Sequence, residues 1–283
     1  MSVPKLHHYV PQFYLKRFTD AKGRLWAWDK SRDLSFRTNP ARVAAETNFY
    51  RMQELADAGH DPYTMEKQLS DLEGQVSLIT DQWLDWLSDV EPGTQIPIPE
   101  VNREEVSLYI AVQYLRTADT KDILCALRDD YETLSEAERT RLHTTLMWDL
   151  RTVHMIRDRI KEFIWIFGRN TAETPFVTSD NPVAFRTPDN RQWRRLGILD
   201  TGMYVVHPLS PKIVMYCHER THWEKMAEFD SCLSPIKFDS EMVESENSGQ
   251  VFMASRFVFS PENDFEHARK FACSIGTDLF APR

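Results

Sequence analysis

The chain has 283 residues, of which 42% are hydrophobic, enough to build a sizeable core. No apolar run approaches the roughly 18 residues of a membrane span, and polar residues interrupt the N-terminal stretch where a signal peptide would be apolar, so we expect a cytoplasmic protein with no membrane partner. The net charge of −9 is uneven: residues 1–51 carry +6 (ten Lys or Arg, four Asp or Glu), and residues 52–166 carry −12 (11 against 23). One interpretation is that the basic segment lies across the acidic middle of the chain. The other is that it forms a local anion site, although the negative net charge of the whole protein repels nucleic acid.

The first predicted elements form an N-terminal segment rich in aromatic and basic residues, over residues 1–51. Residues 7–18 read HHYVPQFYLKRF, in which Pro11 suits the first position of a short helix. Residues 24–29 are typical of a strand, Asn39-Pro40 opens a helical turn, and residues 48–50 are predicted to be extended. A chain end this rich in aromatic side chains is expected to dock on the body of the protein.

Residues 62–163 predict a helical body. After Pro62, apolar residues recur at alternating steps of three and four as far as Leu87, which is the period of one helical face. The prolines between residues 92 and 99 form a connector that no helix can cross.

Capping patterns predict where the next helices begin. A second helix starts near Asn102, with Glu105 in the capping-box position three residues later. Ser135 and Glu138 repeat the same pattern for a third helix, and a further helix is predicted through residues 153–163.

The last third, residues 164–283, consists of short apolar runs separated by Pro, Gly, Asn and Asp. Extended segments are predicted at residues 163–167, 176–177, 183–185, 203–207, 213–217 and 257–259, with a late helix over 241–254. Helices in the middle and strands mainly in the last third indicate an α+β fold. We expect a single domain, residues 1–283, whose helical body carries a small, mostly antiparallel sheet formed by the C-terminal third and N-terminal strands.

The four cysteines, Cys125, Cys217, Cys232 and Cys273, are widely separated and include no CxxC pair. This spacing is typical of buried, reduced thiols and argues against a disulfide framework or a structural zinc site. The sequence also lacks a GxGxxG motif, a P-loop and a GxSxG motif, so no common nucleotide-binding or hydrolase signature is present.

Five short blocks stand out along the chain. They are residues 7–18, Glu66-x-x-Leu69-x-x-x-Glu73, Gln113-x-x-Arg116, the segment FVTSDNPV at 176–183, and Pro208-Leu209-Ser210-Pro211. Together they resemble the blocks of an uncharacterised family, the domain-of-unknown-function 4238 proteins, from about residue 7 to residue 260. The resemblance points to positions of interest and implies no particular chemistry.

His7 and His8 are the first candidate site residues. Histidine titrates near neutrality, so either ring can act as a base, bind a metal or donate to a phosphate. Adjacent residues on an extended segment point to opposite sides, and we therefore expect only one of the two to serve a site. The alternative is that both rings pack against aromatic neighbours.

Two further pairs complete the candidate site. Asp180 and Asn181 precede Pro182, an arrangement typical of a tight turn that presents both side chains rigidly. Gln113 and Arg116 lie one helical turn apart, and the arginine is suited to binding a phosphate or a carboxylate. The structural alternatives are a turn with no further role and an internal ion pair with Asp180 or Glu66.

His218-Glu219-Arg220-Thr221-His222 matches the HExxH pattern of zinc peptidases. Its context argues against that function, because the segment follows an extended apolar run instead of lying within a predicted helix. Arg220 would also place a cation beside the metal. His218 and His222 are therefore the least favoured metal ligands.

The leading hypothesis is a hydrolase acting on a phosphodiester, a nuclease being one form of it. His7 or His8 would act as base or metal ligand, Gln113 and Arg116 would hold the anionic group, and Asp180 with Asn181 would orient the histidine or a divalent cation. The candidate ligands for such a cation are His8, Glu66 and Asp180, and the candidate partner is a nucleic acid or a nucleotide. The oligomeric state stays open.

Two alternatives remain. The polar residues could instead lock the N-terminal segment of a non-catalytic binding or regulatory module; buried and mutually satisfied side chains would favour this reading. A zinc metallopeptidase is the third hypothesis.

Overall fold

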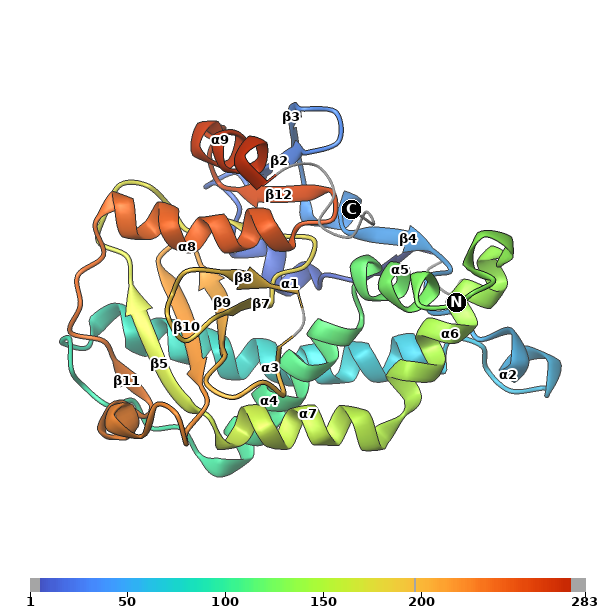
Figure 1. Cartoon of the computed structure of the whole chain (residues 1–283), viewed down its shortest axis with the longest axis horizontal. Coiled ribbons are helices and arrows are strands. Elements are labelled where there is room, and N and C mark those ends of the chain that lie inside the picture. The colour runs from blue at the N-terminus through green and yellow to red at the C-terminus, as the bar shows by residue number, and fades with distance from the viewer. Residues whose placement is uncertain (1–5, 196, 276–283) are drawn as a thin grey trace.

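The computed structural model describes residues 6–195 and 197–275, and it confirms the predicted α+β class (Figure 1). The largest sheet has six strands and is antiparallel except where β11 meets β5. In spatial order the strands are β11 (Cys232–Leu233), β5 (Ile164–Arg169), β10 (Ile213–His218), β9 (Tyr204–Ser210), β7 (Ala184–Arg186) and β8 (Trp193–Arg194).

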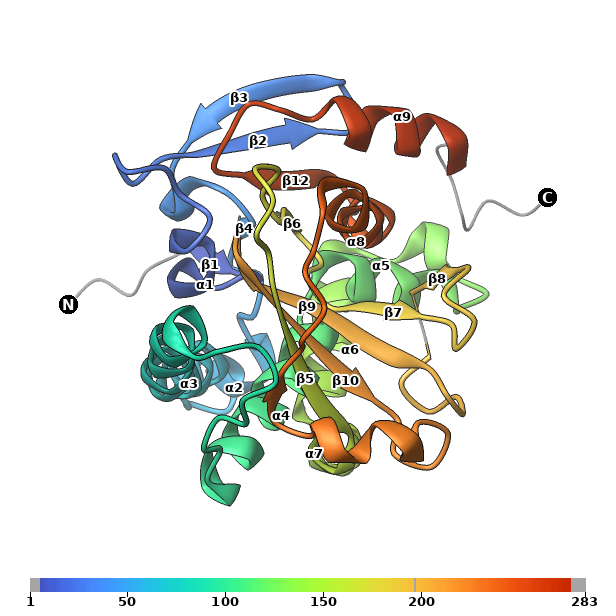
Figure 2. The same ribbon diagram turned by 90° about the vertical axis from the view of Figure 1, so that its left-hand side faces the viewer.

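Helices cover both faces of this sheet (Figures 1 and 2). Three long helices pack on one face: α3 (Thr64–Asp89), α4 (Glu100–Leu115) and α7 (Leu150–Glu162). The single helix α8 (Ser240–Met253) packs on the other. Both faces of the central strands are therefore covered, which explains why their sequences are continuous apolar runs without polar alternation.

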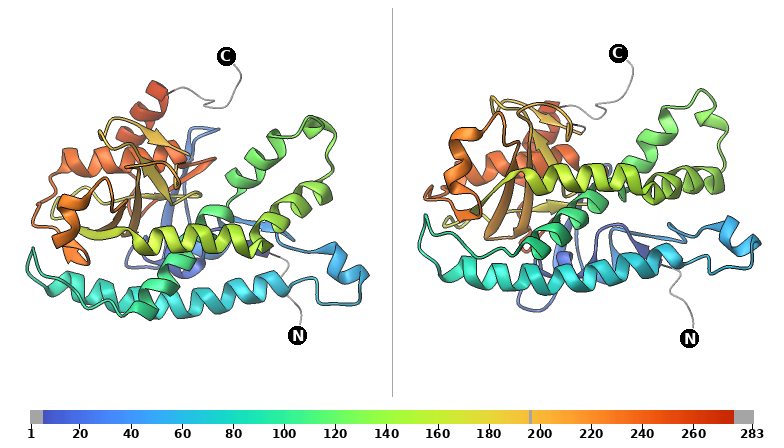
Figure 3. Two further views of the ribbon diagram at one scale, coloured as in Figure 1. Left: turned by 60° about the horizontal axis from the view of Figure 1, so that its bottom comes forward. Right: turned by 90° about the horizontal axis from the view of Figure 1, so that it is seen from below.

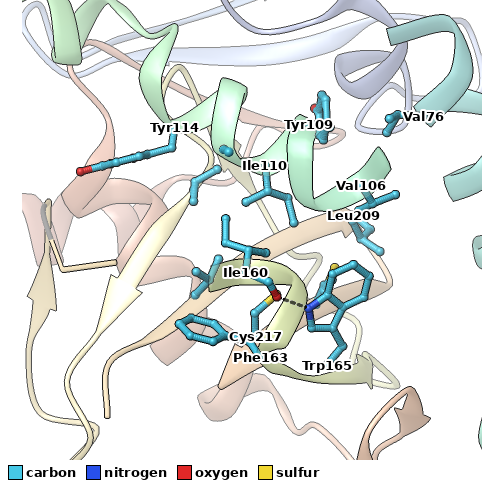
Figure 4. Packing of buried hydrophobic residues seen from close by; sticks show 14 of the residues in the cluster. Val76, Val106, Tyr109, Ile110, Tyr114, Ile160, Phe163, Trp165, Leu209 and Cys217 are labelled. Carbon is cyan, nitrogen blue, oxygen red and sulfur yellow. Dashed lines mark hydrogen bonds between the residues drawn. The ribbon is translucent and has the colours of Figure 1, made fainter. Parts of the chain in front are cut away.

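The main hydrophobic core lies between the three long helices and the sheet. The periodic apolar face of α3 buries Val76, Trp83 and Leu87 there, as the spacing predicted. Figure 4 shows part of this core, in which the Trp165 indole N–H donates to the Ile160 carbonyl at 2.9 Å. This bond satisfies the indole's polar atom inside an apolar environment.

A second sheet joins segments from both ends of the chain. Its order is β3 (Leu34–Thr38), β2 (Leu25–Asp29), β12 (Phe257–Ser260) and β6 (Thr178–Ser179), and all pairs are antiparallel. The helix α9 (Glu266–Ile275) lies beside it (Figure 2). The expected single sheet is thus divided, because β2 and β3 pair with β12 and never reach the six-stranded sheet.

The N-terminal unit consists of β1 (Leu6–His8), α1 (Gln12–Lys16), the 3-10 turn η1 (Pro40–Arg42) and β4 (Ala45–Thr47). β1 pairs antiparallel with β4. The unit lies between α3 and the second sheet (Figure 2). Its aromatic and apolar side chains are largely buried, in agreement with the prediction that this segment docks on the body of the protein. The buried residues include Tyr9, Val10, Tyr14, Leu15 and Phe18.

Some local predictions are wrong. Residues 48–50 form a turn with Asn48 at φ +58°, and the strand is β4 just before them. α4 begins at Glu100 after Pro99, so Glu105 is not in a capping position, whereas the Ser135–Glu138 capping box is present at the start of α6 (Glu136–Trp148).

Several short elements were not predicted. They are α2 (Gln53–Asp57), α5 (Ala118–Ala126), α9 and the 3-10 turns η2 (Tyr131–Thr133) and η3 (Glu224–Phe229). Figure 3 shows α5 and α6 as a helical hairpin that stands away from the sheets. Within the described residues, no helix combines the length and apolar character needed to cross a bilayer.

Gly249 of α8 gives a test of this packing. A Cβ atom there would lie 2.6 Å from the Trp193 ring, which is itself fixed by an indole N–H bond to Ser248 at 2.8 Å. We expect Gly249→Ala to lower the free energy of unfolding by about 1–3 kcal/mol through overpacking. Gly74→Ala, in α3 with nothing near the added atom, should raise it by roughly 0.5–1 kcal/mol. Urea denaturation measures both; equal effects of the two substitutions would contradict the α8–β8 packing.

Candidate functional site

The N-terminal unit meets α3 and α4 across a polar strip in an otherwise apolar interface. α4 contributes Tyr109, Gln113 and Arg116, which recur at helical spacing, and α3 contributes Glu66 and Glu73 two turns apart. A polar face between packed helices is costly unless its members bond to each other or to main chain. The partners of each side chain therefore decide its role.

Arg116 is the centre of this strip and is only 1% exposed. Its Nη1 donates to Glu73 Oε1 at 2.8 Å, its Nη2 donates to the carbonyl oxygen of His8, and its Nε donates to the Tyr50 hydroxyl at 3.3 Å. The Tyr50 hydroxyl in turn donates to the Arg116 carbonyl at 3.0 Å. Arg116 therefore fixes the backbone of β1 relative to both helices.

Gln113 works in the same way. Its Nε2 donates to the carbonyl of Tyr9 at 3.0 Å, and the residue is fully buried. Its Oε1 is also covered and has no hydrogen-bond partner within the described part of the chain. Gln113 and Arg116 thus bind main chain of the N-terminal unit, which differs from the predicted role of holding an anionic group.

The two histidines occupy different surroundings, as expected for neighbours on a strand. His7 is fully buried; its Nδ1 accepts from the Tyr50 backbone N–H at 3.0 Å, and its ring stacks on Tyr50 with centroids 5.9 Å apart. His8 is partly exposed, and Gln12 Nε2 lies 3.5 Å from its Nδ1. The packed ring is therefore His7, and the ring that can serve a site is His8.

His8 is held in its neutral form. Burial lowers its pKa below the usual 6.5, hydrogen bonding to the backbone of Ala41 and Pro40 and the charge of Glu73 raise it, and Arg116 lowers it. Its Nε2 is covered and accepts or donates no hydrogen bond among residues 6–195 and 197–275. At neutral pH the His8 ring is therefore uncharged, and burial makes it a weaker base than a free imidazole.

The pKa of the Glu66 carboxyl is shifted in the opposite direction to that of the His8 ring. Burial raises the pKa of its carboxyl to about 7, with Arg116 lowering it and Glu73 raising it. Its Oε2 is covered and lacks a hydrogen-bond partner in the described ranges. Near neutral pH the carboxyl is about half protonated, and it shares its two charged neighbours with His8.

Asp180 lies outside this group of residues, and its carboxylate has a structural role. Its Oδ1 accepts from the Ser255 N–H at 2.9 Å, and its Oδ2 accepts from the N–H groups of Arg256 and Phe257 at 2.8 Å each. Burial raises its pKa to about 6, against the effect of these three donors. The carboxylate holds the link between α8 and β12, so it does not orient His8 as predicted.

Asn181 belongs to the same second cluster. Its Nδ2 donates to Asp119 Oδ2 at 3.1 Å, and Asp119 also pairs with Arg195. These contacts join α5 to the turn after β6. The structure therefore brings together His8, Glu66, Gln113 and Arg116, and separates Asp180 and Asn181 into a neighbouring network.

No group of three or more His, Cys, Asp or Glu side chains within the described ranges is placed to hold a metal ion. The predicted ligand set of His8, Glu66 and Asp180 is accordingly not assembled.

The HExxH segment lies at the end of a strand. His218 is the last residue of β10 and stacks on Tyr204 with ring centroids 4.5 Å apart. The Glu219 carboxylate accepts from the backbone N–H groups of Thr221 and His222 at 3.0 and 2.9 Å, which forms a turn. The segment thus lacks the helix on which the zinc-peptidase pattern depends.

Tyr109 and Tyr50 were not among the site residues predicted from the sequence. Tyr109 is 3% exposed, packs on Phe13 with ring centroids 5.7 Å apart, and extends from α4 in a different direction from Ile110 (Figure 4). Its position four residues before Gln113 was a usable signal, because residues at that spacing share a helical face. Tyr50 gave no such signal, since its contact with Arg116 spans 66 residues.

Comparison with known proteins places these residues in a family. The family model described as a protein of unknown function (DUF4238) matches residues 6–264. The chain belongs to this family. The match begins at β1 and ends before α9, so it includes every element of the two polar clusters in this DUF4238 protein. No significant match to a curated protein or to a solved structure is found.

The raised pKa of Glu66 predicts a pH-dependent stability. The pKa is 4.5 without the fold and about 7 within it, so the folded state favours the protonated carboxyl. This contribution is complete below about pH 4.5 and is lost as pH rises through about 7. Glu66→Gln, which stays neutral, should therefore gain stability relative to the wild type between about pH 5 and 8 in urea denaturation. Asp71→Asn, on an exposed position of α3, is the control. A difference between Glu66→Gln and wild type that is constant with pH would contradict the assignment.

Proposed function

We propose that this protein is a hydrolase that acts on a phosphodiester, with His8 and Glu66 as its proton-transfer groups. The supporting observation is that His8 Nε2 and Glu66 Oε2 both lack hydrogen-bond partners in the described residues while sharing Glu73 and Arg116 as neighbours. Buried polar atoms are normally paired, and unpaired ones with shifted pKa values concentrate at functional sites.

The protonation states suit acid–base catalysis near neutral pH. His8 is neutral and can accept a proton, while Glu66, with a pKa of about 7, can donate one. Acid and base groups are most efficient when their pKa values lie near the working pH. In this proposal Arg116 is a positioning residue, because it holds the backbone of His8 and the carboxylate of Glu73.

Charge on the N-terminal unit favours an anionic substrate. Lys16 at the end of α1 and Arg42 at the end of η1 are exposed, and these two elements contact each other. Exposed basic side chains attract a phosphodiester strand despite the overall charge of −9.

A non-catalytic binding or regulatory module is the second candidate. The specific observation in its favour is that the hydrogen bonds of Arg116, Gln113 and Asp180 go to main-chain groups, to the Glu73 carboxylate and to the Tyr50 hydroxyl, all within the protein. In that case the polar strip only locks the N-terminal unit, and substitutions at His8 and Glu66 change stability without affecting any turnover.

A cytoplasmic location is part of the proposal. All four cysteines are free thiols, and Cys125, Cys217 and Cys232 are buried. Such cysteine usage suits a reducing compartment, where nucleic acids are accessible as substrates.

His8→Gln tests the proposed function. We expect the purified wild-type protein to cleave labelled single-stranded RNA or DNA near pH 7, assayed with and without Mg²⁺. His8→Gln should lower the rate by about 10²–10⁴-fold, because the base is lost. His60→Gln changes an exposed histidine outside the site and should leave the rate unchanged. Absence of wild-type cleavage, or equal rates for His8→Gln and wild type, would reject the hydrolase and leave the binding module.

A further inference from the structure

We propose that a pocket between α8 and α9 binds a small organic cation, a protonated amine carried on an apolar body. The two helices lie side by side (Figures 1 and 2), and part of the segment 173–177, which leads into β6, completes the lining. The volume of the pocket is about 460 Å³, which lies within the range of small-molecule sites. The pocket shares no residue with the polar strip, so this inference does not depend on the proposed hydrolase.

The walls of the pocket are held in place before any ligand binds. Asn247 of α8 donates its Nδ2–H to the Pro175 carbonyl and accepts the Val177 N–H at its Oδ1, both at 2.9 Å. On the other side, Nδ1 of His267 in α9 lies 3.0 Å from Oε2 of Glu244 in α8. Because these contacts and the apolar packing of α9 fix the walls, a ligand does not have to order them, which lowers the entropic cost of binding.

The lining combines an apolar floor with carboxylates at the rim. Val177 is 6% exposed, Val251 is fully buried, and Phe271 adds an aromatic ring from α9. Glu173 and Glu262 are exposed, and neither carboxylate takes part in a hydrogen bond or an ion pair within residues 6–195 and 197–275. A ligand with an apolar body therefore removes apolar surface from water in this pocket, while a positive group on it meets free acceptors.

The charge of the lining determines the sign of the ligand. Among the described residues that line the pocket there is no Lys or Arg, and the acidic ones are Glu173, Glu244, Glu262 and Asp264. An anion such as phosphate is therefore repelled. A metal ion fits less well than an organic cation, because no three His, Cys, Asp or Glu side chains of the described ranges are placed to hold one. An amine on an apolar body uses both the carboxylates and the floor.

Three matched compounds test the inference. They are phenethylamine, its neutral analogue phenethyl alcohol, and the anion phenylacetate. We expect phenethylamine to shift the amide NMR signals of Asn247 and Ala268 in the isotope-labelled protein, with a Kd of about 10 mM or lower. The alcohol and the anion should bind at least about 10-fold more weakly, because neither donates a charged hydrogen bond to the carboxylates.

Variants locate the site and control for charge. Glu173→Gln combined with Glu262→Gln should weaken phenethylamine binding at least about 10-fold and leave binding of the alcohol unchanged. Ala268→Phe, which places a ring in the pocket from α9, should prevent binding of both compounds. Asp71→Asn combined with Glu228→Gln removes two charges from exposed positions outside the pocket and should keep the wild-type affinity.

Three results would overturn the inference. The first is equal affinity of the wild type for phenethylamine and phenethyl alcohol. The second is equal loss of amine binding in the pocket pair of substitutions and in the control pair. The third is absence of phenethylamine binding at concentrations up to about 10 mM, the weakest affinity that the inference allows.

Discussion

The buried guanidinium of Arg116 is the interaction on which the arrangement of the N-terminal unit depends. A cation removed from water costs several kcal/mol unless charged and polar partners replace its hydration. Here Glu73, Tyr50 and the carbonyl of His8 are those partners, and they come from three different parts of the chain. Because none of them can leave without exposing an unpaired charge, the strand carrying His8 is fixed against α3 and α4.

The same principle, with the opposite sign of charge, organises the neighbouring cluster. The carboxylate of Asp180 gathers three backbone N–H groups after α8, and Asn181 reaches Asp119 on α5. Most polar side chains of the DUF4238 blocks therefore hold segments of the main chain in place. His8 and Glu66 differ from them, because each retains an unpaired polar atom within the described residues and each lies at the partly exposed edge.

The sequence predicted elements whose signal is local. The apolar period of α3 and the capping box at Ser135 are contained within a few turns of chain, and both are confirmed. α5 was missed because its buried face includes Asp119 and Lys121, whose burial is stabilised by Arg195 and Glu136 elsewhere in the chain. The pairing of β12 with β2 was equally inaccessible, since it joins segments more than 200 residues apart.

Prediction of the candidate site succeeded and failed for related reasons. Helical spacing placed Gln113 and Arg116 on one face, and strand geometry separated the two histidines; both conclusions depend only on local periodicity. The role of Asp180 depends on N–H groups about 75 residues away, so a carboxylate in a tight turn could not be distinguished from a catalytic one. Burial and hydrogen-bond partners, which the sequence does not contain, made that distinction.

Hydrogen exchange in Arg116→Lys tests the central role of this guanidinium most directly. Lysine keeps the positive charge but cannot bond Glu73, Tyr50 and the His8 carbonyl together, because it lacks the planar fork of arginine. The amide of Tyr9, which donates to the Ala44 carbonyl at 2.9 Å, should exchange at least about 10-fold faster, with the amides of α8 unchanged. Unchanged protection of the Tyr9 amide would show that the N-terminal unit is held without Arg116.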